Sequence, residues 1–153
     1  MDKELAAFLT SPVMIILGSC DAQMKPEIGR AVGALACAAD SRVDLMVSAW
    51  QWPKMVANIR AGGRLAATFA RPSDYVSYQV KGHAKVDPAT DEHATAATQY
   101  VERITATLGG LGLDRQLVAP WLVIRDLIVL SLRVEETFIQ TPGTKAGQRM
   151  ERR

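Results

Sequence analysis

The chain has 153 residues, of which 48% are hydrophobic and 22% are charged. These values are typical of one folded globular domain, and they exclude a chain that is disordered throughout. The formal net charge of +2 is a weak excess, and the Lys and Arg residues are scattered rather than gathered in a run. The composition therefore predicts no nucleic-acid partner.

Cysteine use and hydropathy bear on where the protein works. Cys20 and Cys37 form no CxxC pair, so we expect two buried, reduced thiols and no metal site. No apolar run reaches the roughly 20 residues that a membrane helix needs. No basic and then apolar leader opens the chain. We therefore expect a cytoplasmic protein with no membrane partner.

The N-terminal third of the chain predicts one short helix and two strands. Asp2 is a good N-cap for an amphipathic helix, and a nearly wholly apolar strand follows over residues 13–19. A second strand over residues 27–38 consists mainly of small residues and carries one charged side chain inside it, Arg30. A lone Arg among small strand residues needs solvent or a partner, and the partner is either an acid such as Asp44 or a ligand.

The middle of the chain predicts three strands and one helix. A strand over residues 43–49 leads to a helix whose first position suits Pro53, and two glycines end that helix. Strands over residues 65–70 and 75–86 follow. The alternation of the second of these strands puts Gln79, Lys81, His83 and Lys85 on one face.

The last third predicts two helices and a long final strand. Asp87 and Pro88 are typical of a helix start, since Asp caps and Pro suits the first turn. A short helical piece is expected over residues 114–118, residues 122–125 are ambiguous, and residues 127–140 form the last strand. We expect residues 144–153 to be a loose, solvated tail that carries Arg149, Arg152 and Arg153.

The order of the elements predicts the fold class. About six strands are joined mainly by short turns, and the helices are inserted between them. This pattern favours an antiparallel barrel with helical decoration over alternating βαβ units. We expect residues 1–153 to form one such domain.

Four segments carry a resemblance to a known family. They are GRAVGAL at 29–35, VSAWQWPKMVANIR at 47–60, YQVKGHA at 78–84 and FIQTPGTKAG at 138–147. In this order and separation they resemble the FMN-binding split-barrel superfamily, the pyridoxamine 5'-phosphate oxidase-like proteins. The resemblance covers nearly the whole chain. It implies a six-stranded antiparallel split β-barrel that forms a homodimer and binds FMN at the subunit interface.

The resemblance also implies roles for single residues. Arg30 would approach the FMN phosphate or ribityl chain, and Ser48 would donate its hydroxyl. Lys54 would neutralise phosphate at a helix N-terminus, where the helix dipole also favours an anion. Gln79 would hydrogen-bond the cofactor near its ring. The implied cofactor-binding set also contains Ala31, Val32 and Ala49.

The function that the resemblance implies is a flavin-dependent oxidoreductase acting on an unknown small molecule. The chain lacks the C-terminal substrate segment of the true oxidases, so we do not expect pyridoxamine phosphate as its substrate. No catalytic side chain is predicted. Two alternatives remain. One is a split barrel that binds cofactor F420 or haem, for which His83 and His93 are the available haem ligands. The other is a non-enzymatic flavin carrier or dimeric interaction module.

Overall fold

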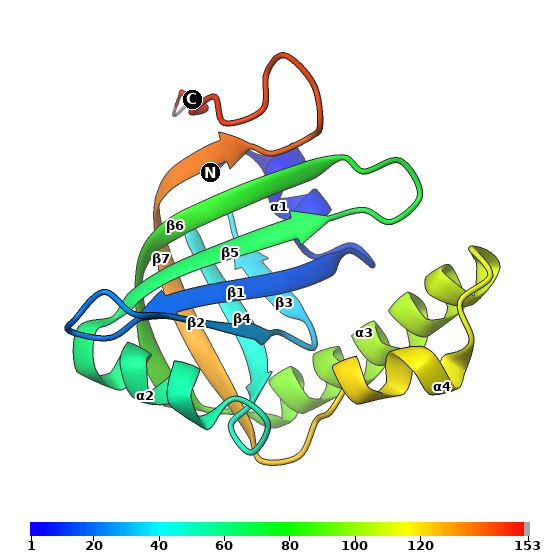
Figure 1. Ribbon diagram of the computed structural model, residues 1–153, viewed down its shortest axis with the longest axis horizontal. Coiled ribbons are helices and arrows are strands. Elements are labelled where there is room, and N and C mark those ends of the chain that lie inside the picture. The colour runs from blue at the N-terminus through cyan, green and yellow to red at the C-terminus, as the bar shows by residue number, and fades with distance from the viewer. Residues whose placement is uncertain (152–153) are drawn as a thin grey trace.

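The structure is a computed structural model that describes residues 1–151, and it is built around one seven-stranded antiparallel sheet (Figure 1). The strands are β1 Met14–Cys20, β2 Pro26–Arg30, β3 Ala34–Cys37, β4 Arg42–Ser48, β5 Arg64–Ala70, β6 Ser77–Pro88 and β7 Leu127–Ile139. The helices are α1 Lys3–Leu9, α2 Pro53–Gly62, α3 Asp91–Gly110 and α4 Arg115–Val118, followed by the 3-10 turn η1 Ala119–Trp121. Arg152 and Arg153 of the predicted tail lie outside the described residues.

The sheet curls into a barrel. Its strand order is β2-β1-β5-β6-β7-β4-β3, so the two edge strands are consecutive segments of the chain. The short link between them closes the barrel with two hydrogen bonds. The Ala31 amide donates to the Ile15 carbonyl of β1 at 3.3 Å, and the Val32 amide donates to the Met46 carbonyl of β4 at 2.8 Å. The predicted split β-barrel is therefore confirmed.

The strand expected over residues 27–38 is two strands, which raises the count from six to seven. The break lies at Gly33, whose φ of 138° is a conformation that side-chain-bearing residues rarely adopt. At this point the backbone stops pairing with β1 and begins pairing with β4. The sequence pattern did not reveal the break, because small residues continue on both sides of it.

The core lies inside the barrel and under two of the helices. Its largest fully buried side chains include Phe69, Leu17, Leu45 and Leu130 from the strands and Leu9 from α1. Helix α3 adds one buried stripe at helical spacing, formed by Ala97, Tyr100, Ile104 and Leu108. Each large apolar side chain buried in this way contributes roughly 1.5–3 kcal/mol to folding. No helix within residues 1–151 is long and apolar enough to cross a membrane.

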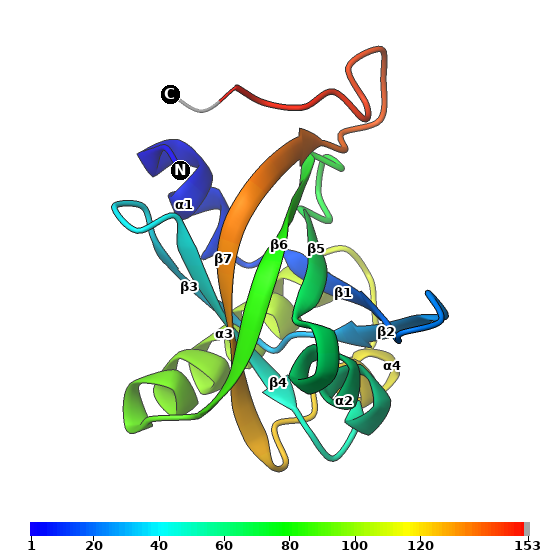
Figure 2. The ribbon, with the colours of Figure 1, turned by 90° about the vertical axis from the view of Figure 1, so that its left-hand side faces the viewer.

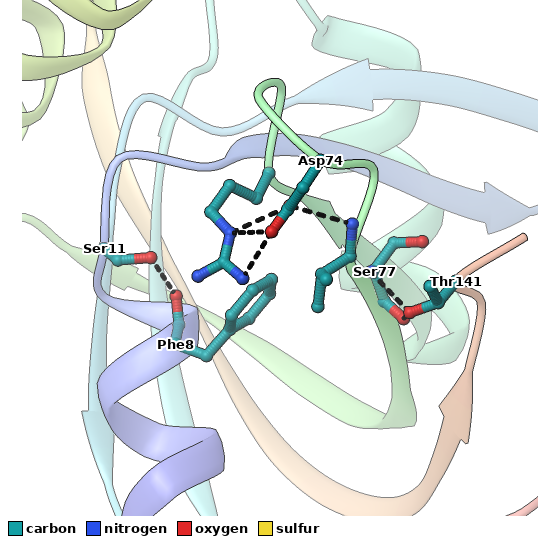
Figure 3. A network of polar contacts seen from close by, with 7 residues as sticks. Phe8, Ser11, Asp74, Ser77 and Thr141 are labelled. Carbon is teal, nitrogen blue, oxygen red and sulfur yellow. Dashed lines mark hydrogen bonds and ion pairs between the residues drawn. The ribbon is translucent and has the colours of Figure 1, made fainter.

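Helix α1 is fixed to the turn between β5 and β6 by a polar and aromatic contact (Figure 3). Arg71 donates from Nε and Nη2 to the two carboxylate oxygens of Asp74, at 2.9 and 2.8 Å. Its guanidinium carbon lies 5.4 Å from the centre of the Phe8 ring, which meets the ring of Tyr78 edge-on. The hydrogen bond from Arg71 holds the pKa of Asp74 below its usual range.

The prediction that Asp87 and Pro88 begin a helix is wrong. Both residues belong to β6, where they pair with β7, and α3 begins only at Asp91. Pairing along a twelve-residue strand outweighs the local start signal. The N-cap is Thr90, and the ring of His93 completes a capping box by accepting the Thr90 amide at 3.1 Å. Sequence rules expect Glu or Gln at that position.

The segment after β7 turns back along that strand, and its described residues lie at the same end of the barrel as the N-terminus (Figure 2). The Ile139 amide donates to the Gln148 carbonyl at 2.9 Å, and the Met150 amide donates to the Thr137 carbonyl at 2.8 Å. These bonds give residues 148–150 a defined path. The looseness of residues 144–153 in solution stays a prediction.

Candidate functional site

Arg30 and Gln79, two of the predicted site residues, lie in register on one face of the sheet. Arg30 pairs with Ile16, Ile16 with Thr68, and Thr68 with Gln79, across β2, β1, β5 and β6. Directly opposed residues of antiparallel strands point to the same side. Ile16 is 39% exposed, so this is the outer side of the barrel. Three strand spacings set the ends of this outer row about 14 Å apart.

The next row of the same face is formed by small residues with one large apolar neighbour. Ile28 pairs with Gly18, Gly18 with Ala66, and Ala66 with Lys81. A side chain added at Gly18 would meet no atom within 4 Å, so the surface there is open and flat. Ile28 is 66% exposed although it is large and apolar. The outer face thus has a flat area at Gly18 and Ala66, beside the row that joins Arg30 to Gln79.

The guanidinium of Arg30 lacks a complete set of hydrogen-bond partners within the described residues. Its guanidinium carbon lies 5.0 Å from the centre of the Trp121 ring. Within residues 1–151, its Nη1 is buried and has no hydrogen-bond partner. The nearby Tyr100 gives it no anion, because burial raises the pKa of that phenol and its hydroxyl donates to the Val13 carbonyl at 2.7 Å. An acceptor placed at Nη1 would remove a desolvation cost of roughly 1–3 kcal/mol.

The alternative partner for Arg30, Asp44, is engaged elsewhere. Asp44 accepts a hydrogen bond from Ser131 at 2.7 Å and lies 3.4 Å from the Nε of Arg42. His93 lies 3.8 Å from its other carboxylate oxygen. The suggested pairing of Arg30 with Asp44 is therefore wrong, because Asp44 faces β7 and the start of α3.

Ser48 and Ala49 are bonded to the loop that precedes β7. The fully buried Ser48 hydroxyl donates to the Arg125 carbonyl at 2.6 Å and accepts from the Gln51 amide at 3.2 Å. The Ala49 amide donates to the Asp126 carbonyl at 3.0 Å. In this arrangement both donors are used within the chain, and a ligand would have to replace the carbonyls that now accept from them.

Ala31 and Val32 lie beneath the site rather than on it. Each side chain is only 2% exposed, and their amides make the two hydrogen bonds that close the barrel. They fix where β2 ends, and through it the position of Arg30. Their role in contacting a cofactor stays a prediction.

Lys54 stands on the other side of β2 from the outer row. It lies in the first turn of α2, its side chain is 80% exposed, and its ammonium is 3.9 Å from the carboxylate of Glu27. Glu27 alternates with Ile28, so it points away from the outer face. The cap residue Trp52 offers no side-chain hydrogen bond to this helix start. Lys54 and the first-turn amides therefore form an electropositive end beside the edge strand.

Sequence reasoning missed the neighbours that the loop before β7 brings to this region. Gln51 donates from Nε2 to the Pro120 carbonyl at 2.7 Å, across 69 residues of sequence. Its Oε1 is buried without a partner in the described part of the chain. Arg125 lies over the Trp50 ring at 4.7 Å. No local pattern could have predicted these contacts, because they join segments that only the closed barrel brings together.

The titratable groups outside this region form no metal site in the described chain. His83 lies 3.2 Å from Glu135, and this hydrogen bond holds the pKa of the Glu135 carboxyl below its usual range. His93 is a helix-capping residue. Both cysteines are free, as expected, but they are half-buried at strand ends, so the expectation of fully buried thiols is wrong.

The closed antiparallel sheet and its decorating helices define the fold as a split β-barrel. No family model matches the sequence, and no curated protein matches it either. The fold is shared with solved structures at low identity. An F420 reductase is 13% identical with a TM-score of 0.57, covering 90% of this chain and 98% of that one. A proposed pyridoxamine 5'-phosphate oxidase from Lactobacillus delbrueckii is 16% identical with a TM-score of 0.55, covering 90% and 93%.

A third neighbour widens the range of ligands on this fold. HutZ of Vibrio cholerae, described as a haem storage protein, is 12% identical with a TM-score of 0.54 and covers 90% of this chain and 93% of that one. The resemblance to split-barrel proteins is thus confirmed at the level of the fold. The named neighbours differ in what they bind or transform, so the fold alone leaves the ligand to the residues of this chain.

Proposed function

We propose that the protein binds FMN across its outer face and acts as a flavin-dependent oxidoreductase on a small molecule. The observation that carries this proposal is the outer row, with Gln79 at one end and Arg30 at the other, whose buried Nη1 has no partner among residues 1–151. A guanidinium suits a phosphate group, and an amide suits the polar edge of a flavin ring. A ligand touching both ends must be extended.

The remaining residues of the face fit the same ligand. Gly18 and Ala66 leave room for a flat ring close to the sheet. Lys54 and the uncapped start of α2 lie on the other side of β2, so they would add only a longer-range positive charge to the site. A bound flavin supplies the electron transfer, while the chain binds, orients and shields it. The absence of a predicted catalytic side chain is compatible with this division of work.

The first test is retention of the cofactor. Purified protein would be incubated with FMN, desalted, and examined by absorbance. We expect a stoichiometric flavin spectrum that survives desalting. Protein that stays colourless, and shows no quenching of flavin fluorescence at micromolar concentration, would overturn the proposal. Flavin that is bound but never reduced by any nicotinamide or chemical donor would instead indicate a carrier.

We also propose that the protein is a homodimer whose interface covers the outer face. Large exposed apolar side chains such as Ile16 and Ile28 on a flat sheet are typical of an interface between subunits. Ile28→Glu should convert a dimer to a monomer in light scattering. Leu117→Glu, at a similarly exposed position on α4, is the matched control and should leave the dimer intact. A wild-type monomer would contradict this part of the proposal.

Haem is a second candidate because of the environment of His83. The His83 side chain is 55% exposed, its Nδ1 faces Glu135, and it lines a groove of about 510 Å³ together with Cys20 and Met24. A carboxylate on Nδ1 orients a histidine so that Nε2 is free to bind a metal. A Soret band that appears with haemin and is lost in His83→Ala would favour haem. Preferential binding of F420 over FMN would favour the deazaflavin.

We propose that the protein works in the cytoplasm. Cys20 and Cys37 are unpaired and partly exposed, which suits a reducing compartment such as the cytoplasm. We propose that the small-molecule substrate reaches the flavin at the edge of the subunit interface, and we assign no catalytic residue.

A further inference from the structure

Residues 119–126, here called the covering segment, run from η1 to the start of β7 and lie against the residues around Arg30 and Ser48. The Trp121 ring stacks on the Arg30 guanidinium at 5.0 Å. The Arg125 carbonyl accepts the hydrogen bond of the Ser48 hydroxyl at 2.6 Å. The segment thus contacts two of the residues that the resemblance assigns to cofactor binding, Arg30 and Ser48.

The covering segment also engages the backbone and the side chain that follow Ser48. Its Asp126 carbonyl accepts from the Ala49 amide at 3.0 Å, and its Pro120 carbonyl accepts from Gln51 Nε2 at 2.7 Å. A hydroxyl, an amide N–H and a guanidinium are together the kind of donor set that binds a phosphate or carboxylate. The covering segment and an anionic ligand would therefore compete for the same groups.

The covering segment satisfies these groups incompletely. It offers neutral carbonyls and an aromatic ring, and it leaves the Arg30 Nη1 and the Gln51 Oε1 buried without partners among residues 1–151. Both side chains border η1, and of the two atoms Nη1 is the donor that an anion can satisfy. A charged oxygen bonds a guanidinium more strongly than an aromatic face does. An anion would therefore displace the Trp121 ring from Arg30.

The covering segment has little regular secondary structure. It contains one 3-10 turn of three residues, and Ile124 within it is 46% exposed. Trp121 and Leu122 pack against the core, so an opening of the segment has to release these two side chains. Segments outside regular strands and helices, such as binding loops, generally open at lower free energy than the core does. Figure 1 shows this stretch at the lower edge of the barrel, between α4 and β7.

We propose that the covering segment gates the anion site. It closes on Arg30, Ser48 and Gln51 in the structure described here, and it moves aside when the phosphate group of a ligand takes these donors. The identity of the ligand as FMN rests on the proposed function, whereas the gate requires only an anion. Trp121 is the residue that the ligand must displace.

Hydrogen exchange in the wild-type protein tests the gate without any substitution. Amide exchange would be followed at residues 119–126 with no addition, with FMN, and with inorganic phosphate. We expect faster exchange over the covering segment when FMN or phosphate is bound, and unchanged exchange in α3. Binding of FMN with no change over residues 119–126 would overturn the gate while leaving the proposed function standing.

A variant gives a second readout. Trp121→Ala removes the competing ring and should raise FMN affinity by about tenfold, on the scale of one cation–π contact. Leu117→Ala, also near this segment but 62% exposed, is the control and should change nothing. A loss of affinity in Trp121→Ala would make Trp121 part of the binding surface and would contradict the gate.

The two proposals fail in different ways. FMN binding to Trp121→Ala but not to the wild type would support the gate. If FMN binds to neither protein, the proposed function fails, and inorganic phosphate becomes the probe. Faster exchange over residues 119–126 with phosphate would then still support the gate, and unchanged exchange would overturn it.

Discussion

Two arginines of this protein stack on aromatic rings, and they differ in what completes their hydrogen bonding. Arg71 lies over Phe8 and donates to both oxygens of Asp74, on the exposed turn that holds α1 (Figure 3). Arg30 lies over Trp121 at a similar distance, yet its Nη1 is buried and has no partner among the described residues. The first arginine has an anionic partner in the chain, and the second has none among residues 1–151.

The difference separates an arginine that stabilises the fold from an arginine that is available to bind a ligand. A chain that only needs stability pairs a guanidinium with a nearby carboxylate, as Arg71 does three residues from Asp74. Around Arg30 the neighbouring acids are turned away, since Asp44 faces Ser131 and Glu27 faces Lys54. A buried unpaired donor persists when a ligand satisfies it in the working state. This contrast is the physical basis for placing an anionic ligand at Arg30.

The largest expected effect comes from removing the Arg30 guanidinium. Arg30→Ala should weaken FMN binding by about 100-fold, because a charge-assisted contact to phosphate contributes about 1.5–3 kcal/mol. Arg71→Ala should leave FMN affinity unchanged while lowering the thermal midpoint. Flavin fluorescence titration measures the first quantity, and calorimetry measures the second. Equal losses of affinity in both variants would remove the distinction between the two arginines.

A bulky side chain at Gly18 on the outer face should have the next largest effect on FMN affinity. Gly18→Leu places a side chain where no atom lies within 4 Å, so the fold should tolerate it. The same side chain would stand where the flavin ring is proposed to lie, and we expect about a tenfold loss of FMN affinity from overpacking. Gly109→Leu, at an open position of α3, is the matched control. Unchanged FMN binding in Gly18→Leu would place the ring elsewhere.

Lys54 should have a smaller effect that depends on salt. Its side chain is 80% exposed and stands on the far side of β2 from the outer row. Lys54→Gln should therefore weaken FMN binding by only about two- to threefold at low salt, and less at high salt. Isothermal titration at two ionic strengths measures this. A loss as large as that of Arg30→Ala would show that Lys54 binds the phosphate directly.

The smallest effect concerns the pH dependence of the Arg71 pair. The hydrogen bond from Arg71 lowers the pKa of Asp74 below its usual value of 3.8. A carboxyl whose pKa is lower when folded stabilises the protein above its usual pKa, and that contribution is lost as the pH falls through the lowered value. Wild type and Asp74→Asn should therefore differ in thermal midpoint at pH 7 and converge near pH 2. A constant difference would contradict the pairing.

Much of the fold was predictable because its signals are local. The Asp2 cap, the Pro53 helix start and the Gly63 helix stop all lie where the sequence puts them. The break at Gly33 was missed because its cause is the closure of the barrel, which is a long-range event. Asp87 and Pro88 wrongly predicted a helix start for the same reason, because their long-range pairing with β7 outweighs their local helix-start preference.

The candidate site was predictable only in part. Arg30 and Gln79 stood out as polar groups in strand sequence, and the register places them in one row. Their relation depends on the order β2-β1-β5-β6, which no local pattern contains. Gln51 and Trp121 were missed because their contacts join segments at least 69 residues apart in the sequence. Such contacts follow from topology, so a single sequence gives no signal for them.

The most direct test of the account compares FMN with riboflavin in the wild type and in Arg30→Ala. The two ligands share the ring and the ribityl chain and differ by the phosphate group. We predict that the wild type prefers FMN strongly and that Arg30→Ala abolishes most of that preference, because Arg30 is the partner of the phosphate. An equal preference for FMN in both proteins would contradict the central claim that Arg30 is held for an anionic ligand.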